Sequence, residues 1–114
     1  GIMALTFITL CRLVGIPAQW QSGLSVSLTG VGCHDWAMFY IAPKGWMYAD
    51  CSFGASMARQ DDETMRRHYF GSLDTGRMVA NRAFEAPFDP PMTGFRSDPH
   101  DNHPGECGPV RRCP

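Results

Sequence analysis

A long, mostly apolar run near the N-terminus most constrains the fold of this 114-residue chain. Residues 2–14, IMALTFITLCRLV, would be apolar on nearly every face of a helix, and the run is too long for a typical strand. Gly15 and Pro17 follow it directly, in the order that is typical of a helix C-terminus. We therefore predict a central helix that is buried on most of its sides.

Two aromatic-rich segments farther along predict a β-hairpin. They span residues 34–41 and 46–52, and the sequence Ala-Pro-Lys-Gly between them is typical of a turn. The remaining expected elements are a strand over 17–26, a loop over 27–32, a helix from Asp61 to about Phe70 and a strand over 78–84. The fold class that follows is α+β, with one buried helix packed on a small antiparallel sheet.

The hairpin can bring His34 and Asp50 together. A five-residue connection over 41–45 would pair Trp36 with Asp50. The same register would pair Ser52 with His34. His34 and Asp50 would then be diagonal neighbours on one face, roughly 7–8 Å apart at Cα. A connection with an even number of residues and no bulge would place them on opposite faces.

An imidazole held by a carboxylate forms two thirds of a nucleophilic triad. The carboxylate fixes the tautomer of the imidazole, which can then accept a proton from a nucleophile. A surface His34 and an unrelated Asp50 would produce the same sequence spacing. The spacing alone therefore leaves both interpretations open.

Three ordered motifs resemble the core of the transglutaminase-like superfamily. They are CRLVGIPA at residues 11–18, HDW at 34–36 and GWMYAD at 45–50, and the resemblance covers about residues 1–54. The later stretch over 68–97 is similar to an extension in some bacterial members. The resemblance implies a papain-like fold and a thiol enzyme that acts on amide bonds of a protein or peptide substrate. It assigns His34 as general base and Asp50 as its orienting partner, and it implies no metal or organic cofactor.

The resemblance also implies a nucleophilic cysteine at the start of the central helix. Counting back from GIPA places that cysteine one position before Gly1, so the chain would be an inactive fragment. Cys11 is a poor substitute, because it lies ten residues farther along the helix than Gly1, or ~15 Å. Cys33 and Cys51 should point to the face opposite the His34–Asp50 pair.

The domain expected from these signals covers residues 1–97, as a core over 1–54 and an extension over 55–97. Residues 98–114 are poor in apolar side chains and should form an unstructured tail. Its residues His100, His103, Cys107 and Cys113 suit zinc by type but not by a common spacing. With a formal net charge of -1, no long basic run and no apolar run of transmembrane length, the sequence indicates no nucleic-acid partner and no membrane-spanning segment. The compartment stays undetermined.

Two alternatives remain open from the sequence. Trp36, Trp46 and Tyr48 would share the face of the His–Asp pair, either lining a substrate cleft or serving as core residues. The whole domain could also be a non-catalytic module that binds peptides or proteins, because a fold does not settle a function.

Overall fold

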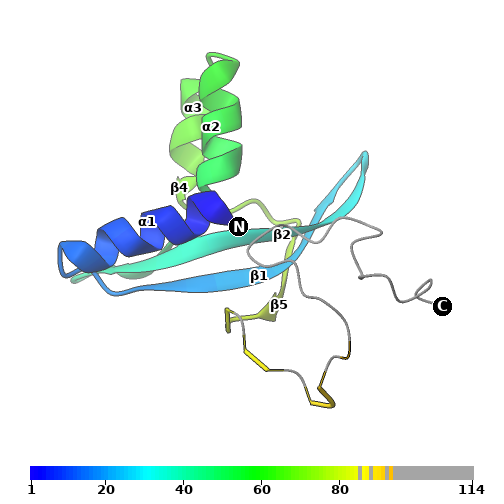
Figure 1. The fold of residues 1–114 in the computed structure, drawn as a ribbon. Helices are drawn as coiled ribbons and strands as arrows, with labels where there is room; N and C mark the ends of the chain where they lie inside the picture. Colours follow the sequence, from blue (N-terminus) through cyan, green and yellow to red (C-terminus); the bar gives the residue numbers. More distant parts are fainter. Residues whose placement is uncertain (85, 88, 92, 94–114) are drawn as a thin grey trace.

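The chain is described by a computed structural model that covers residues 1–84, 86–87, 89–91 and 93. It is an α+β fold with a five-stranded antiparallel sheet in the order β4-β3-β2-β1-β5 (Figure 1). The elements in chain order are α1 (Ile2–Leu13), β1 (Ala18–Ser27), β2 (Gly30–Ile41), β3 (Gly45–Ala49), α2 (Cys51–Arg59), α3 (Glu63–His68), β4 (Phe70–Gly71) and β5 (Arg77–Asn81). The predicted fold class is thus confirmed.

The first helix ends in a motif that its sequence predicts. Gly15 adopts φ +78°, and its amide donates to the carbonyl of Arg12 while the amide of Ile16 donates to that of Cys11. The guanidinium of Arg12 then donates to the carbonyl of Ala18, at 3.0 Å from Nε and 2.7 Å from Nη2. These bonds fix the direction in which the chain leaves α1 and enters β1.

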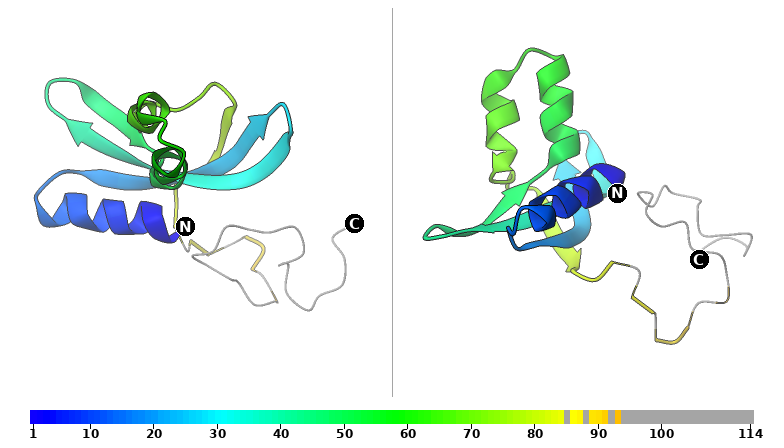
Figure 2. Two further views of the ribbon diagram at one scale, coloured as in Figure 1. Left: turned by 90° about the horizontal axis from the view of Figure 1, so that it is seen from above. Right: turned by 60° about the vertical axis from the view of Figure 1, so that its left-hand side comes forward.

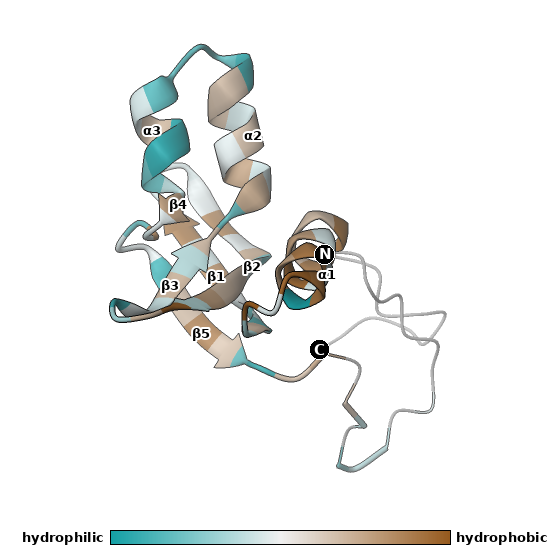
Figure 3. Ribbon diagram, turned by 90° about the vertical axis from the view of Figure 1, so that its left-hand side faces the viewer, coloured by the Kyte–Doolittle hydropathy of each residue, from teal (hydrophilic) through white to brown (hydrophobic). Residues whose placement is uncertain are grey.

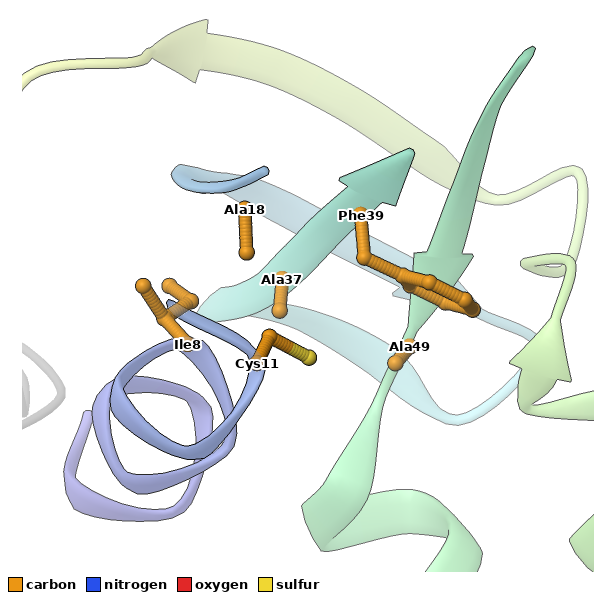
Figure 4. Close-up of a cluster of buried hydrophobic side chains, with 6 residues drawn as sticks. All are labelled: Ile8, Cys11, Ala18, Ala37, Phe39 and Ala49. Carbon is orange, nitrogen blue, oxygen red and sulfur yellow. The ribbon is translucent and has the colours of Figure 1, made fainter. Parts of the chain in front are cut away.

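One face of α1 packs on the sheet and forms the core. The buried cluster comprises Ile8, Cys11, Ala18, Ala37, Phe39 and Ala49 (Figure 4). The expectation of a helix buried on most sides is wrong, because the sheet covers only one side of it. The apolar side chains left exposed on α1 and at its end are Ile2, Met3, Leu10, Leu13 and Val14.

The loop expected over 27–32 is instead the end of a long β-hairpin. β1 and β2 pair continuously from Ala18↔Phe39 to Ser27↔Gly30, and only Leu28 and Thr29 form the turn. The small residues that indicated a loop remain extended because β1 supplies their hydrogen-bonding partners. His34 therefore lies within a strand rather than at its start.

The β2–β3 connection has the predicted parity. Ile41 pairs with Gly45 and Ala37 with Ala49, so the register would place Trp36 opposite residue 50. The predicted strand ends too late, however, because α2 begins at Cys51. The carboxylate of Asp50 accepts from the amide of Phe53 and caps this helix, which ends the strand at Ala49. Ser52 is therefore a helical residue and not a strand partner of His34.

The helical pair α2–α3 stands roughly across the direction of α1 (Figure 2). The sequence interpretation missed α2, whereas α3 lies inside its predicted range and is capped by Asp62. Most of α3 is coloured as hydrophilic in Figure 3, and Arg66 and Arg67 both pair with Glu63 on an exposed face. β5 covers the first half of the strand predicted over 78–84.

None of the helices in the described ranges is long and apolar enough to cross a membrane. The predictions made for residues 98–114, a tail without regular structure and the alternative zinc ligands His100, His103, Cys107 and Cys113, lie outside the described residues.

Candidate active site

His34 and Asp50 meet just beyond the end of the β2–β3 ladder. His34 projects from β2, while Asp50 lies at the junction of β3 and α2, and the distance from Nε2 to Oδ2 is 2.8 Å. The side chain of His34 is 10% exposed and that of Asp50 is fully buried. The pair thus combines a carboxylate shielded from water with an imidazole that solvent or a substrate can still reach.

The nitrogen that faces the carboxylate determines which nitrogen can act as a base. With Nε2 against Oδ2 of Asp50, the neutral ring of His34 carries its proton on Nε2 and donates it to the carboxylate. Nδ1 is then left with a free lone pair. The arrangement can accept a proton at Nδ1 and stabilise the resulting imidazolium through Asp50.

Local hydrogen bonds fix the second oxygen of Asp50. Oδ1 accepts from the amide of Phe53 and from the hydroxyl of Ser52, each at 3.0 Å. The Ser52 hydroxyl also lies 3.5 Å from Nε2 of His34, on the side of the ring that the carboxylate occupies. Ser52 is therefore placed to orient Asp50 rather than to be deprotonated by Nδ1.

A buried arginine contacts the same carboxylate. Nη1 of Arg77 lies 2.8 Å from Oδ2 of Asp50, and its Nη2 lies 2.9 Å from Oδ2 of Asp74. The Arg77 side chain is 4% exposed. Asp50 therefore has one neighbour whose charge depends on pH, His34, and one that is always cationic.

These contacts lower the pKa of Asp50. Burial by itself would raise that pKa, but the hydrogen bonds from His34 and from the Phe53 amide oppose it, together with the charges of His34 and Arg77. Their sum holds the pKa below the ordinary aspartate value. Asp50 is consequently a carboxylate at neutral pH, as an orienting partner must be.

Aromatic rings enclose His34. Its ring lies 4.5 Å from that of Phe53 and 6.4 Å from that of Trp36, measured between centroids. Trp36 is fully buried, and its indole N–H donates to Oε1 of Gln21 at 2.7 Å. Of the three aromatic residues singled out from the sequence, Trp36 alone contacts His34. The other two, Trp46 and Tyr48, pair with Tyr40 and Met38 farther along β2.

The three described cysteines are poorly suited to be the nucleophile. Burial raises the pKa of the Cys11 thiol. Burial, followed by the negative charge of Asp50 and the neighbouring Cys11, raises the pKa of Cys51 to about 11. Cys33 is exposed but alternates with His34 along β2, on the other face of the strand.

The start of α1 lies against β2. The amino group of Gly1 forms an ion pair with Asp35, the residue that follows His34 in the strand. The start of the helix thus contacts Asp35, which alternates with His34 along β2, and not the His34–Asp50 pair itself.

The motifs and this geometry together define an α+β domain with a buried carboxylate that orients a histidine. A model of the transglutaminase-like superfamily matches residues 2–51, which include all three sequence motifs and both His34 and Asp50. No curated protein and no solved structure matches the chain. The match over residues 2–51 supports the resemblance of this part of the chain to the transglutaminase-like superfamily.

The sequence interpretation missed Phe53 and Arg77, and it misplaced Ser52, although all three contact the pair. Ser52 was predicted to lie in a strand. It lies in the first turn of α2, which can be predicted only if Asp50 is recognised as the cap of that helix. Arg77 carries no periodic or motif signal that links it to Asp50. The spacing Asp74-x-x-Arg77 could have indicated a local ion pair, but not its contact with a carboxylate on another element.

Proposed function

We propose that this chain supplies the general base and its orienting carboxylate to a cysteine-dependent enzyme that cleaves or transfers amide bonds of proteins or peptides. The observation that carries the proposal is the bond from Nε2 of His34 to a fully buried Asp50, which leaves Nδ1 as the basic nitrogen. The superfamily match over residues 2–51 supports the same chemistry.

The reaction follows from these roles. Nδ1 of His34 takes the proton of a cysteine thiol, and the thiolate attacks the amide carbonyl to form a tetrahedral intermediate. The intermediate collapses to a thioester when the imidazolium returns the proton to the departing amine. Water or a second amine then attacks the thioester, with His34 again as base, and releases the thiol. Attack by water gives a peptidase or amidase, and attack by an amine gives a transglutaminase.

The nucleophile in this proposal is a cysteine one position before Gly1, at the N-terminus of α1. A helix start favours the thiolate over the thiol, and an adjacent imidazolium adds to that effect. The start of α1 lies against β2 at Asp35, the residue that follows His34 in the chain. The cysteines within the described residues have raised pKa values or face away, which supports a nucleophile outside them.

The test uses the chain extended upstream with its native residues. Iodoacetamide labelling over a pH series, with sites located by mass spectrometry, should find a fast-reacting thiol immediately before Gly1. His34→Ala should slow its labelling near neutral pH by roughly tenfold or more, because the thiolate fraction falls. Asp50→Ala should slow it less, since the base remains.

Two controls sharpen this experiment. Cys11→Ala and His68→Ala should leave the fast label unchanged, because neither residue contacts the pair. The chain without the upstream cysteine should show no acyl-transfer or peptidase turnover. If the fast label falls on Cys11, Cys33 or Cys51, or if His34→Ala has no effect, the catalytic proposal is wrong and a non-catalytic binding module takes its place.

A further inference from the structure

We propose that Arg77 is a positioning residue that keeps Asp50 ionised and directed at His34. Its catalytic consequence rests on the function proposed above, whereas its effect on the His34–Asp50 pair can be measured independently. Arg77 is the first residue of β5 and lies outside residues 2–51, where the superfamily match ends. The described structure therefore completes the site with a residue from the C-terminal side of the family core.

The contacts show that Arg77 and His34 share one oxygen atom. Nη1 of Arg77 and Nε2 of His34 each lie 2.8 Å from Oδ2 of Asp50. The other oxygen, Oδ1, is occupied by the Phe53 amide and the Ser52 hydroxyl. Rotation of the Asp50 carboxylate would break contacts at both oxygens, so Arg77 helps to fix the direction in which Oδ2 points.

The charge of Arg77 matters most when His34 is neutral. When His34 is neutral and Arg77 is not counted, Asp50 is a fully buried anion with no cation beside it. Such an anion is strongly disfavoured. Arg77 stays cationic throughout and remains 4% exposed, so its field is little screened by water. It therefore keeps Asp50 negative in the resting state, in which His34 must hold its proton on Nε2.

The guanidinium itself is held rigidly. Nε and Nη2 contact the carboxylate of Asp74, at 3.1 Å and 2.9 Å from Oδ2. The guanidinium carbon lies 4.5 Å from the ring centroid of Phe53 and 5.3 Å from that of Trp36. The same two rings lie beside His34, so Phe53 and Trp36 contact both the imidazole and the guanidinium. A lysine would supply the positive charge, but it could neither bind Asp74 through two nitrogens nor stack on the aromatic rings.

The first experiment is an NMR titration of the chain with labelled carboxyl carbons and histidine nitrogens. In the wild type, Asp50 should titrate below the ordinary aspartate range and His34 should carry its proton on Nε2 at neutral pH. In Arg77→Met, the Asp50 midpoint should rise by roughly 1–3 pH units, since an opposite charge at this distance lowers a carboxyl pKa by that amount. Arg67→Met, which removes an exposed arginine on α3, should change neither signal.

A second measurement needs no substitution and therefore does not depend on a variant that folds. In the wild type, the guanidinium nitrogen signals of Arg77 should shift with the same midpoint as the Asp50 carboxyl, while those of Arg67 should not. Arg77 signals that ignore the Asp50 titration would overturn the proposal. An Arg77→Met protein that folds and keeps both the Asp50 midpoint and the His34 tautomer would overturn it equally.

The outcomes separate this inference from the proposed function. If His34→Ala slows alkylation in the extended protein but Arg77→Met leaves the Asp50 midpoint unchanged, only the role of Arg77 is wrong. If Arg77→Met shifts Asp50 while His34→Ala leaves alkylation unchanged, the acyl-transfer function fails and the electrostatic coupling stands. If both proposals are correct, the acid limb of the pH–rate profile for alkylation should shift to higher pH in Arg77→Met, together with the titration midpoint of Asp50.

Discussion

Nε2 of His34 lies 2.8 Å from Oδ2 of Asp50, although 16 positions separate the two residues along the chain. The β2–β3 register brings them together, because Ala37 pairs with Ala49 and the next residue leaves the strand to cap α2. Asp50 thus ends a strand, begins a helix and holds the imidazole. A substitution at this position should therefore affect stability and chemistry together.

Asp50→Ala should destabilise the fold well beyond the loss of a helix cap. It would leave buried Arg77 and His34 without their shared carboxylate, and breaking a buried charge pair from one side costs about 3–5 kcal/mol. The matched control is Asp62→Ala, which removes the cap of α3 and should cost only about 1 kcal/mol. Urea unfolding measures both, and equal losses would contradict a networked role for Asp50.

The stability that Asp50 contributes should disappear in acid. Its pKa is lowered in the folded state, so the unfolded chain binds the proton first as the pH falls. The contribution is fully present above the ordinary aspartate pKa of about 3.9 and is lost as the pH falls through the lower, folded value.

Asp74 also has a lowered pKa, mainly because of its hydrogen bond from Arg77, so it contributes to the acid sensitivity as well. Comparison of the wild type with Asp50→Asn isolates the contribution of Asp50. The difference in unfolding free energy between wild type and Asp50→Asn should be constant at neutral pH and should shrink below about pH 4. A difference that stays constant into strong acid, or that shrinks on raising the pH, would show that the Asp50 pKa is not lowered.

The described cysteines should differ sharply in reactivity. Cys33 is exposed and should be alkylated first, whereas Cys11 is buried and Cys51 has a pKa raised to about 11. At neutral pH a thiol with that pKa is a thiolate for only about one part in ten thousand. Peptide mapping after short iodoacetamide treatment checks the order, and full denaturation should equalise the three sites. Faster labelling of Cys51 than of Cys33 would contradict the burial described here.

Local sequence signals predicted the parts of the site that depend on strand alternation and helix ends. Gly15 and Pro17 located the end of α1, and the parity of the connection over 41–45 placed His34 and Asp50 on one face. Such features depend on residues close in sequence. The family motifs then indicated what the pair could do.

The remaining errors have a common physical cause, which is tertiary pairing. Small residues over 27–32 form strand because β1 supplies partners, a fact that local propensity does not contain. Asp50 ends its strand because its side chain caps a helix whose start has no strong local signal. Arg77 reaches Asp50 only after β5 has returned to pair with β1, so no spacing in the sequence indicates that contact.

The close approach of β1 and β5 at Gly23 should determine where Arg77 lies. Gly23 lies in β1 opposite His34 on one side and Val79 on the other, at a register shift in the β1–β5 ladder. A Cβ at Gly23 would lie 1.8 Å from the carbonyl oxygen of Met78, so β5 must move if Gly23 is replaced by Ala. We expect Gly23→Ala to lower the free energy of unfolding by about 1–3 kcal/mol, as overpacking does, and to raise the Asp50 titration midpoint by displacing Arg77.

The control is Gly32→Ala, in the same hairpin, where an added Cβ meets nothing within 4 Å. That substitution should be neutral or stabilising by up to about 1 kcal/mol and should leave Asp50 unchanged. Urea unfolding and the carboxyl titration measure both effects, and a Gly23→Ala protein with wild-type stability and an unshifted Asp50 would show that the β1–β5 approach does not position Arg77.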